Sequence, residues 1–173
     1  MIIHTDIDTV PLYPYPVVTM GNFDGVHDGH KKIISEVVAR AQKNYGTSVV
    51  LTYWPHSKVY FGVMQEKELL QTLDERLDAI KKLGVDVVIV FPFTDTFSQI
   101  PAETFIETVL IEKIGIKEIV VGYDSVFGKD KKGNKVLLDA YSKQGNFSVF
   151  QVDPLADSTG EIISSTSLRN YPL

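Results

Sequence analysis

Two histidines stand three residues apart in a glycine-rich segment near the start of the chain. The segment reads G-N-F-D-G-V-H-D-G-H, from Gly21 to His30, and it separates an apolar run from an amphipathic stretch. The glycines let the backbone turn sharply and approach a ligand closely. On the first turn of a helix, His27 and His30 share one face, and the helix N-terminus offers free N–H groups to a phosphate. The segment therefore indicates a site that binds a polyphosphate and stabilises the charge that develops as it breaks.

The same residues allow other interpretations. Asp24 fits a turn or a cap as well as it fits a functional carboxylate. His27 and His30 are also zinc-ligand types, but no carboxylate or cysteine stands at a familiar ligand spacing. We therefore expect no metal site built from protein ligands alone.

A second polar segment, I-S-S-T-S-L-R, lies near the end of the chain. Ser164, Ser165 and Thr166 place hydroxyl and N–H groups at an expected helix start, where an anion binds readily. Arg169 follows three residues after Thr166 and can clamp a phosphate with its planar guanidinium. Alone, the S-S-T sequence indicates an N-cap, but together with the distant histidine segment it predicts the second half of a phosphate site.

Alternating apolar and amphipathic stretches predict the elements that position these segments. Strands are expected at about 17–20, 48–53, 85–91, 118–121 and 147–152. Helices are expected from Gly29, from Thr72 in a T-x-x-E capping box, from Pro101, and over about 136–143. Glycines at 46, 84, 115 and 145 end the amphipathic stretches, as left-handed caps do. Because several strands are continuous apolar runs, we expect an α/β fold with a doubly wound parallel sheet of about five strands, which binds ligands beyond the strands' carboxyl ends.

Composition narrows the function classes. The 173 residues suit a single domain over 1–173, and the absence of cysteine fits a reducing cytoplasm. The net charge of −5 argues against broad nucleic-acid binding. The longest apolar run, 87–93, is too short to span a membrane, and the N-terminus lacks the pattern of a signal peptide.

The segment from Gly21 to His30 resembles the H-x-G-H nucleotidyltransferase superfamily, and its form G-N-F-D-G-V-H is similar to that of bacterial FAD synthetases. Three later segments are similar to segments of the same family: L-T-Y-W-P-H at 51–56, V-G-Y-D-S-V-F-G-K at 121–129 and I-S-S-T-S-L-R at 163–169. The resemblance covers about 17–169. It implies the Rossmann-like nucleotidyltransferase fold and transfer of AMP from ATP to FMN, giving FAD and pyrophosphate, with Mg²⁺ held largely by phosphates.

The resemblance also implies roles for individual residues. His27, His30 and Arg169 are expected to stabilise the triphosphate and the leaving pyrophosphate, and Asn22 to orient the triphosphate. The expected ATP-binding residues are Gly21, Asn22, Phe23, His27, Gly29, His30, Ser164, Ser165, Thr166 and Arg169. The expected flavin-binding residues are His56, Tyr123, Asp124, Phe127 and Lys129. The neighbouring Tyr53 and Trp54 fit two interpretations about equally well: they line a flavin or phosphate pocket, or they lie in the core or at the rim of the pocket.

The chain departs from the family pattern at two positions. Ser125 stands where an aromatic residue is common, and Val126 where arginine is common. These departures bear on the expected binding of the flavin and not on that of the nucleotide. No riboflavin kinase module is expected in 1–173. ATP and FMN are the expected partners, without nucleic acid or membrane, and the sequence leaves the oligomeric state open. Two alternatives remain: a nucleotidyltransferase for another phosphorylated acceptor, and an inactive regulator that binds flavin or nucleotide.

Overall fold

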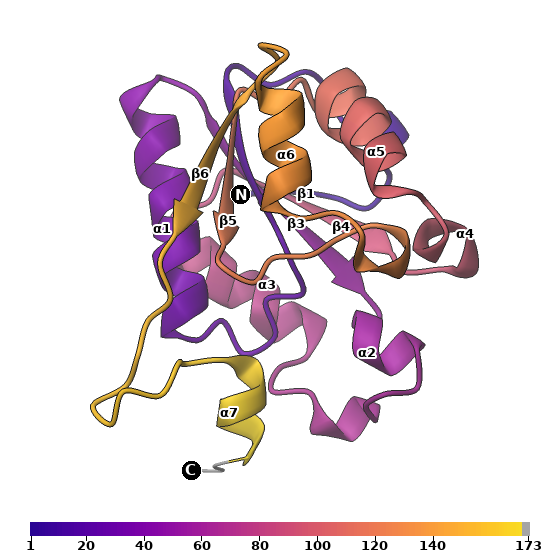
Figure 1. Ribbon diagram of the computed structural model, residues 1–173. Helices are drawn as coiled ribbons and strands as arrows, with labels where there is room; N and C mark the ends of the chain where they lie inside the picture. Colours follow the sequence, from indigo (N-terminus) through magenta and orange to yellow (C-terminus); the bar gives the residue numbers. More distant parts are fainter. Residues whose placement is uncertain (171–173) are drawn as a thin grey trace.

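A single parallel sheet of six strands forms the centre of the protein. The computed structural model describes residues 1–170, and 171–173 lie outside the described part. The strands are β1 (Ile2–His4), β2 (Pro16–Met20), β3 (Thr47–Trp54), β4 (Val87–Pro92), β5 (Glu118–Gly122) and β6 (Ser148–Val152). Their order is β1-β4-β3-β2-β5-β6, and every neighbouring pair is parallel (Figure 1). The predicted fold class is confirmed, with six strands instead of about five.

The additional strand is β1, at one edge of the sheet. It has only three residues, and it pairs with β4 from Ile2 opposite Val87 to His4 opposite Ile89. The side chains of Ile2 and Ile3 are exposed. Since the segment is short and has no buried face, it lacks the apolar pattern that predicted the other strands.

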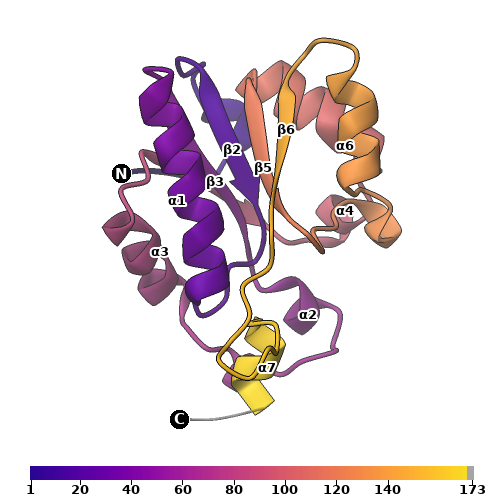
Figure 2. The ribbon, with the colours of Figure 1, turned by 60° about the vertical axis from the view of Figure 1, so that its left-hand side comes forward.

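Helices cover both faces of the sheet (Figures 1 and 2). The longer ones are α1 (Asp28–Lys43), α3 (Leu73–Lys82), the π-helix η3 (Phe105–Ile114) and α6 (Lys135–Ser142). The short ones are η1 (Ile7–Thr9), α2 (Ser57–Tyr60), η2 (Glu66–Glu68), α4 (Asp95–Ser98), α5 (Ala102–Thr104), η4 (Lys129–Lys131) and α7 (Ser165–Asn170). Among residues 1–170, no helix has both the length and the apolar character needed to cross a membrane.

Alternate residues of the strands pack into cores on opposite faces of the sheet. Val50 and Val88 pack with Ile34 of α1 and Ile80 of α3 on one face. Their strand neighbours point to the other face, where the core includes Ile106 and Leu110 of η3 and Leu138 of α6. This two-sided burial explains why the strands read as continuous apolar runs.

One predicted helix cap is wrong in its conformation. Gly84, Gly115 and Gly145 have left-handed φ angles, as expected for glycines that follow helices. After α1, however, the left-handed residue is Tyr45, with a φ of 53°. A Cβ atom at Gly46 would collide with the carbonyl oxygen of Tyr15. Position 46 therefore requires glycine because two backbone segments approach closely, and not because of its φ angle.

The strand order places a crevice at the carboxyl ends of β2 and β5. The chain runs from β2 outward through β3 to β4, and then crosses to the opposite side of β2 to form β5 and β6. Connections from β2 and β5 consequently leave toward opposite faces, which is where α/β sheets bind ligands. The glycine-rich segment follows β2 directly, so the fold puts it in this crevice.

Candidate functional site

The glycine-rich loop, defined here as residues 21–27, connects β2 to α1. Phe23, Gly25 and Val26 all have left-handed φ angles, of 50°, 85° and 38°. A Cβ atom at Gly25 would lie 2.7 Å from Cδ1 of Leu70. The loop is thus tightly wound and packed against the segment before α3, and this conformation sets the start of α1 at the crevice.

His27 and His30 form a stacked pair at the start of α1. Their ring centroids are 3.6 Å apart and their planes differ by 23°. The ring of Phe23 meets His30 edge-on, with centroids 5.2 Å apart. A Cβ atom at Gly29 would lie 3.0 Å from the His27 ring, so this glycine makes room for the stack. The predicted pairing of the two imidazoles on one helical turn is present.

Both imidazoles are neutral at pH 7. Burial lowers the pKa of His27, and burial together with the neighbouring His27 ring and the charge of Arg76 lowers the pKa of His30 to about 3. Nδ1 of His27 accepts a hydrogen bond from the backbone N–H of His30 at 3.4 Å, which caps the helix. A neutral ring with an accepting Nδ1 carries its proton on Nε2. His27 therefore offers a neutral N–H donor instead of a full positive charge.

An open groove of about 750 Å³ lies beside His27. Its lining residues are His27, Asp28, Asp157, Thr159, Glu161, Ile162, Ile163, Ser167 and Leu168. Ile162 and Leu168 are about 40% exposed there and form part of an apolar wall. The groove joins the start of α1 to the start of α7, the two predicted phosphate segments, and it is large enough for a small-molecule ligand.

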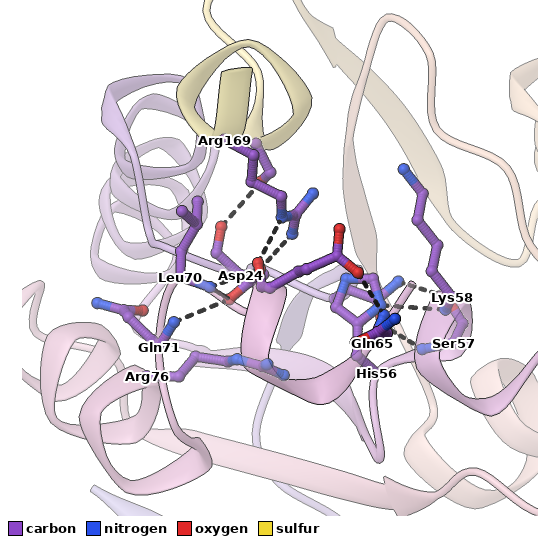
Figure 3. A network of polar contacts seen from close by, with 12 residues as sticks. Asp24, His56, Ser57, Lys58, Gln65, Leu70, Gln71, Arg76 and Arg169 are labelled. Carbon is purple, nitrogen blue, oxygen red and sulfur yellow. Dashed lines mark hydrogen bonds and ion pairs between the residues drawn. The ribbon is translucent and has the colours of Figure 1, made fainter. Parts of the chain in front are cut away.

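Asp24 links three segments that are distant in sequence. Its side chain is 1% exposed, and its carboxylate accepts hydrogen bonds from the backbone N–H groups of Leu70 and Gln71 at 3.1 Å. The guanidinium of Arg169 forms an ion pair with the same carboxylate through Nη2 (Figure 3). Nε of Arg169 also donates to the carbonyl oxygen of Glu68 at 3.1 Å. Asp24 therefore joins the glycine-rich loop, the segment before α3, and α7.

Asn22 organises the other side of the loop. Its Nδ2 donates to Oγ of Ser57 at 2.9 Å, and its Oδ1 accepts from the backbone N–H of Ser57 at 3.1 Å. The hydroxyl of Thr52 donates to the carbonyl oxygen of Asn22 at 3.2 Å. His56, which precedes Ser57, is buried, and its Nδ1 caps α2 by accepting from the N–H of Lys58 at 3.1 Å. Burial lowers the pKa of His56 to about 4, so it is also neutral at pH 7.

The serine-rich segment lies against the glycine-rich loop, as the two motifs predict. Ser165 donates its hydroxyl to the carbonyl oxygen of Asp24 at 2.8 Å. Ser164 acts as a cap, because its Oγ accepts from the N–H of Ser167 at 3.1 Å. Thr166 is exposed. Figure 2 shows α7 below the carboxyl ends of the strands and near the first turn of α1.

The predicted flavin residues occupy different environments. Asp124 is exposed and lies near enough to His27 to act on its pKa. Tyr123 is 45% exposed and Lys129 is exposed. Phe127 is 7% exposed and belongs to the core, with its ring centroid 6.0 Å from that of Phe105. In this structure Phe127 supports the loop from within, whereas Tyr123 and Lys129 are accessible to a ligand.

Two residues of the site were not singled out by the sequence reasoning. The sequence pattern fits Asp24 as a turn or cap residue as well as a functional carboxylate, although its place in a glycine-rich loop points to the site. Arg76 of α3 is fully buried and close to His30 and His56. The helical spacing could have identified it, because position 76 falls on the apolar helix face formed by Leu73, Leu77 and Ile80, where a charged residue is unusual.

The chain is similar to known proteins over most of its length. The model of the FAD synthetase family matches residues 13–167. A bifunctional riboflavin kinase/FMN adenylyltransferase of Buchnera aphidicola subsp. Schizaphis graminum is 34% identical over 152 residues, which are 88% of this chain and 49% of that protein. The chain thus spans about half the length of the curated relatives it matches.

Two solved structures have similar folds. A protein from Streptococcus pneumoniae described as a macrolide-efflux protein has a TM-score of 0.82 and 27% identity, covering 98% of this chain and 56% of that one. A pantoate-beta-alanine ligase from Francisella tularensis has a TM-score of 0.61 and 14% identity, covering 99% of this chain and 74% of that one. The second likeness supports the fold alone.

Proposed function

The chain belongs to the FAD synthetase family, and from this membership we propose that it transfers AMP from ATP to FMN, forming FAD and pyrophosphate. One observation carries the proposal from the structure. The two polar segments at 21–30 and 164–169, which resemble the family's motifs, meet at the carboxyl ends of the strands through Asp24, Ser165 and Arg169. They frame a groove at the start of α1, where a phosphate is stabilised by free N–H groups and the helix dipole.

The proposed reaction needs no protein nucleophile. A phosphate oxygen of FMN attacks the α-phosphorus of ATP, the bond between that phosphorus and the bridging oxygen breaks, and pyrophosphate leaves with the electron pair. The attacking phosphate is already ionised, so no general base is required. Catalysis then consists of positioning and of stabilising negative charge.

Each residue of the site has a role in this proposal. The Nε2–H of His27 and the N–H groups at the start of α1 donate to the phosphates. His30 supports the His27 ring and lies at the same helical turn, and Arg169 supplies positive charge from α7. Asn22 holds the loop against α2, so that the donors keep their orientation. Ser164 and Ser165 fix the start of α7, Thr166 is exposed there for a ligand contact, and Gly21, Phe23 and Gly29 shape the backbone.

The flavin would lie beyond the strands' carboxyl ends, near the loop that follows β5. Tyr123, Asp124 and Lys129 are exposed along that loop, which supports contacts with FMN. His56 and Phe127 are buried and would shape the pocket from behind.

We further propose that Mg²⁺ accompanies ATP and is held mainly by phosphate oxygens. In the described part of the chain, no three His, Asp or Glu side chains are grouped so that they could hold a metal ion. Mg²⁺ in nucleotide sites is commonly bound by one or two carboxylates and substrate phosphates, and it keeps several waters. We also propose that 1–173 forms one adenylyltransferase domain and that it works in the cytoplasm.

The test is to incubate the protein with ATP, Mg²⁺ and FMN and to look for FAD by chromatography. FAD should form with FMN, whereas riboflavin in place of FMN should give neither FMN nor FAD, because riboflavin lacks the attacking phosphate. Protein that binds FMN and ATP but forms no FAD would instead support a flavin- or nucleotide-binding regulator, the alternative that Ser125 and Val126 keep open. AMP transfer only to another phosphorylated acceptor would support the second alternative.

A further inference from the structure

Arg76 is a buried cation without an ion-pair partner. Its side chain extends from α3 and is 0% exposed. Nη1 donates to Oγ1 of Thr52 at 3.3 Å and to the carbonyl oxygen of Tyr53 at 3.2 Å. Nε and Nη2 are buried and have no hydrogen-bond partner, and none of the ion pairs within residues 1–170 involves Arg76. The Trp54 ring, 5.6 Å from the guanidinium carbon, is an aromatic neighbour.

Packing alone does not account for arginine at this position. Position 76 lies on the inner face of α3 with Leu73, Leu77 and Ile80, where an apolar side chain would be expected. Taking an unpaired charge out of water is costly, and a guanidinium does not lose its charge in proteins. Charges kept buried at such a cost are concentrated at functional sites.

The charge of Arg76 acts on the glycine-rich loop from beneath. Thr52, which accepts from Arg76, donates in turn to the carbonyl oxygen of Asn22 in that loop. The charge is also close enough to lower the pKa of His30 and of His56. In Figure 3 the Arg76 side chain extends below Asp24 toward His56.

We propose that Arg76 is a permanent, water-shielded source of positive potential for a polyphosphate bound at the glycine-rich loop. It is a positioning residue that acts through the protein, because its free N–H groups are buried and do not reach a ligand. Asp24 is already paired with Arg169, so Arg76 adds a positive charge that no direct ion pair within residues 1–170 offsets. This inference rests on the proposed function, since it assumes that the loop binds phosphates.

The test is a calorimetric titration of inorganic pyrophosphate into the wild-type protein and three variants at low salt. Arg76→Met removes the charge and the donors, Arg76→Gln keeps donors without the charge, and Arg76→Lys keeps the charge while its buried ammonium stays protonated, for which the titrations are repeated at pH 6. We expect the Met and Gln variants to bind pyrophosphate about tenfold more weakly, and the Lys variant to stay within about threefold of the wild type. The difference should shrink at high salt only slightly, because a buried charge is poorly screened.

Arg40→Met is the matched control. It also removes one positive charge, but Arg40 pairs with Glu36 and Glu118 and lies about 18 Å along α1 from its start. Its affinity for pyrophosphate should stay within about twofold of the wild type. Urea unfolding of each variant checks that the fold is retained, and the Gln variant carries the test should the Met variant not fold.

Three results would overturn the inference. The first is that the Met and Gln variants bind pyrophosphate as tightly as the Arg40 control. The second is that the Lys variant loses as much affinity as they do even at pH 6, where a buried ammonium is more readily protonated, which would show that shape and not charge is required. The third is that the wild type binds no pyrophosphate. Failure of the proposed function is seen separately, as an absence of FAD in the assay with ATP and FMN.

Discussion

The ion pair between Asp24 and Arg169 should make a large contribution to stability as well as to the site. The Asp24 side chain is 1% exposed and that of Arg169 is 14% exposed. Removing one partner of a buried pair leaves the other charge uncompensated, which costs about 3 to 5 kcal/mol. Asp24 also accepts two backbone N–H groups, so its loss has two separate effects.

The expected loss of unfolding free energy depends on which residue is substituted and by what. Asp24→Asn keeps an oxygen that can accept from Leu70 or Gln71, and Arg169 is partly hydrated, so we expect a cost of about 2 kcal/mol, below the range for loss of a fully buried partner. For a chain of this size, that corresponds to a fall in Tm of about 4 to 8 °C. Arg169→Met should cost about 3 kcal/mol, because it leaves the more deeply buried charge alone.

The assay is urea unfolding of the two single variants and the double variant, followed by circular dichroism. The double-mutant cycle should give a coupling energy of about 1.5 to 3 kcal/mol. The control is the same cycle on Asp8 and Lys113, an ion pair with side chains 70% and 43% exposed, for which we expect less than about 1 kcal/mol. A coupling at Asp24 and Arg169 no larger than that of the control would refute the reasoning.

Three further predictions concern the histidines and the loop after β5. His27→Ala should lower kcat for FAD formation about 100-fold, because it removes one preorganised donor, and should lower Tm by only about 2 to 4 °C through loss of the helix cap; a normal rate per folded molecule would contradict this. The folded-state pKa of His30, about 3, lies below its unfolded value, so the unfolded chain binds more protons and stability is lost as pH falls. His30 should account for about 1.5 to 2 kcal/mol of the loss between pH 7 and 5 in urea unfolding, next to a similar share from His56, and His30→Gln should remove the His30 share; an unchanged pH slope in that variant would count against the cause. Val126→Arg, at a position 51% exposed, should lower the KM for FMN and leave the KM for ATP nearly constant; the reverse pattern would assign the loop to ATP.

The parts of the fold that depend on neighbours in sequence were predictable. The capping box at Thr72 is present, with the N–H of Glu75 donating to its hydroxyl at 3.2 Å and its own N–H donating to Glu75 at 2.8 Å. The strands β2, β3, β4 and β5 were predictable because both faces are buried, which produces continuous apolar runs. β1 was missed because three residues at an edge carry no such pattern.

The parts of the site that depend on contacts between distant residues were harder to predict from the sequence. The motifs brought His27 and Ser165 into one site, but nothing near Asp24 in sequence indicates that Leu70 and Arg169, 46 and 145 residues away, bind its carboxylate. Phe127 looked like a ligand contact by its place in a motif, and only the three-dimensional packing shows it against Phe105. Arg76 was detectable in principle, since a charged residue on an apolar helix face conflicts with the local pattern.

The strand order and the position of α7 have a consequence for synthesis of the chain. The glycine-rich loop leaves the ribosome early, whereas α7 follows β6, the last strand. A nascent chain could therefore complete the whole sheet while Asp24 still lacks its ionic partner and the groove still lacks one wall. Since domains can begin to fold during synthesis, nucleotide binding should become possible only after α7 has emerged.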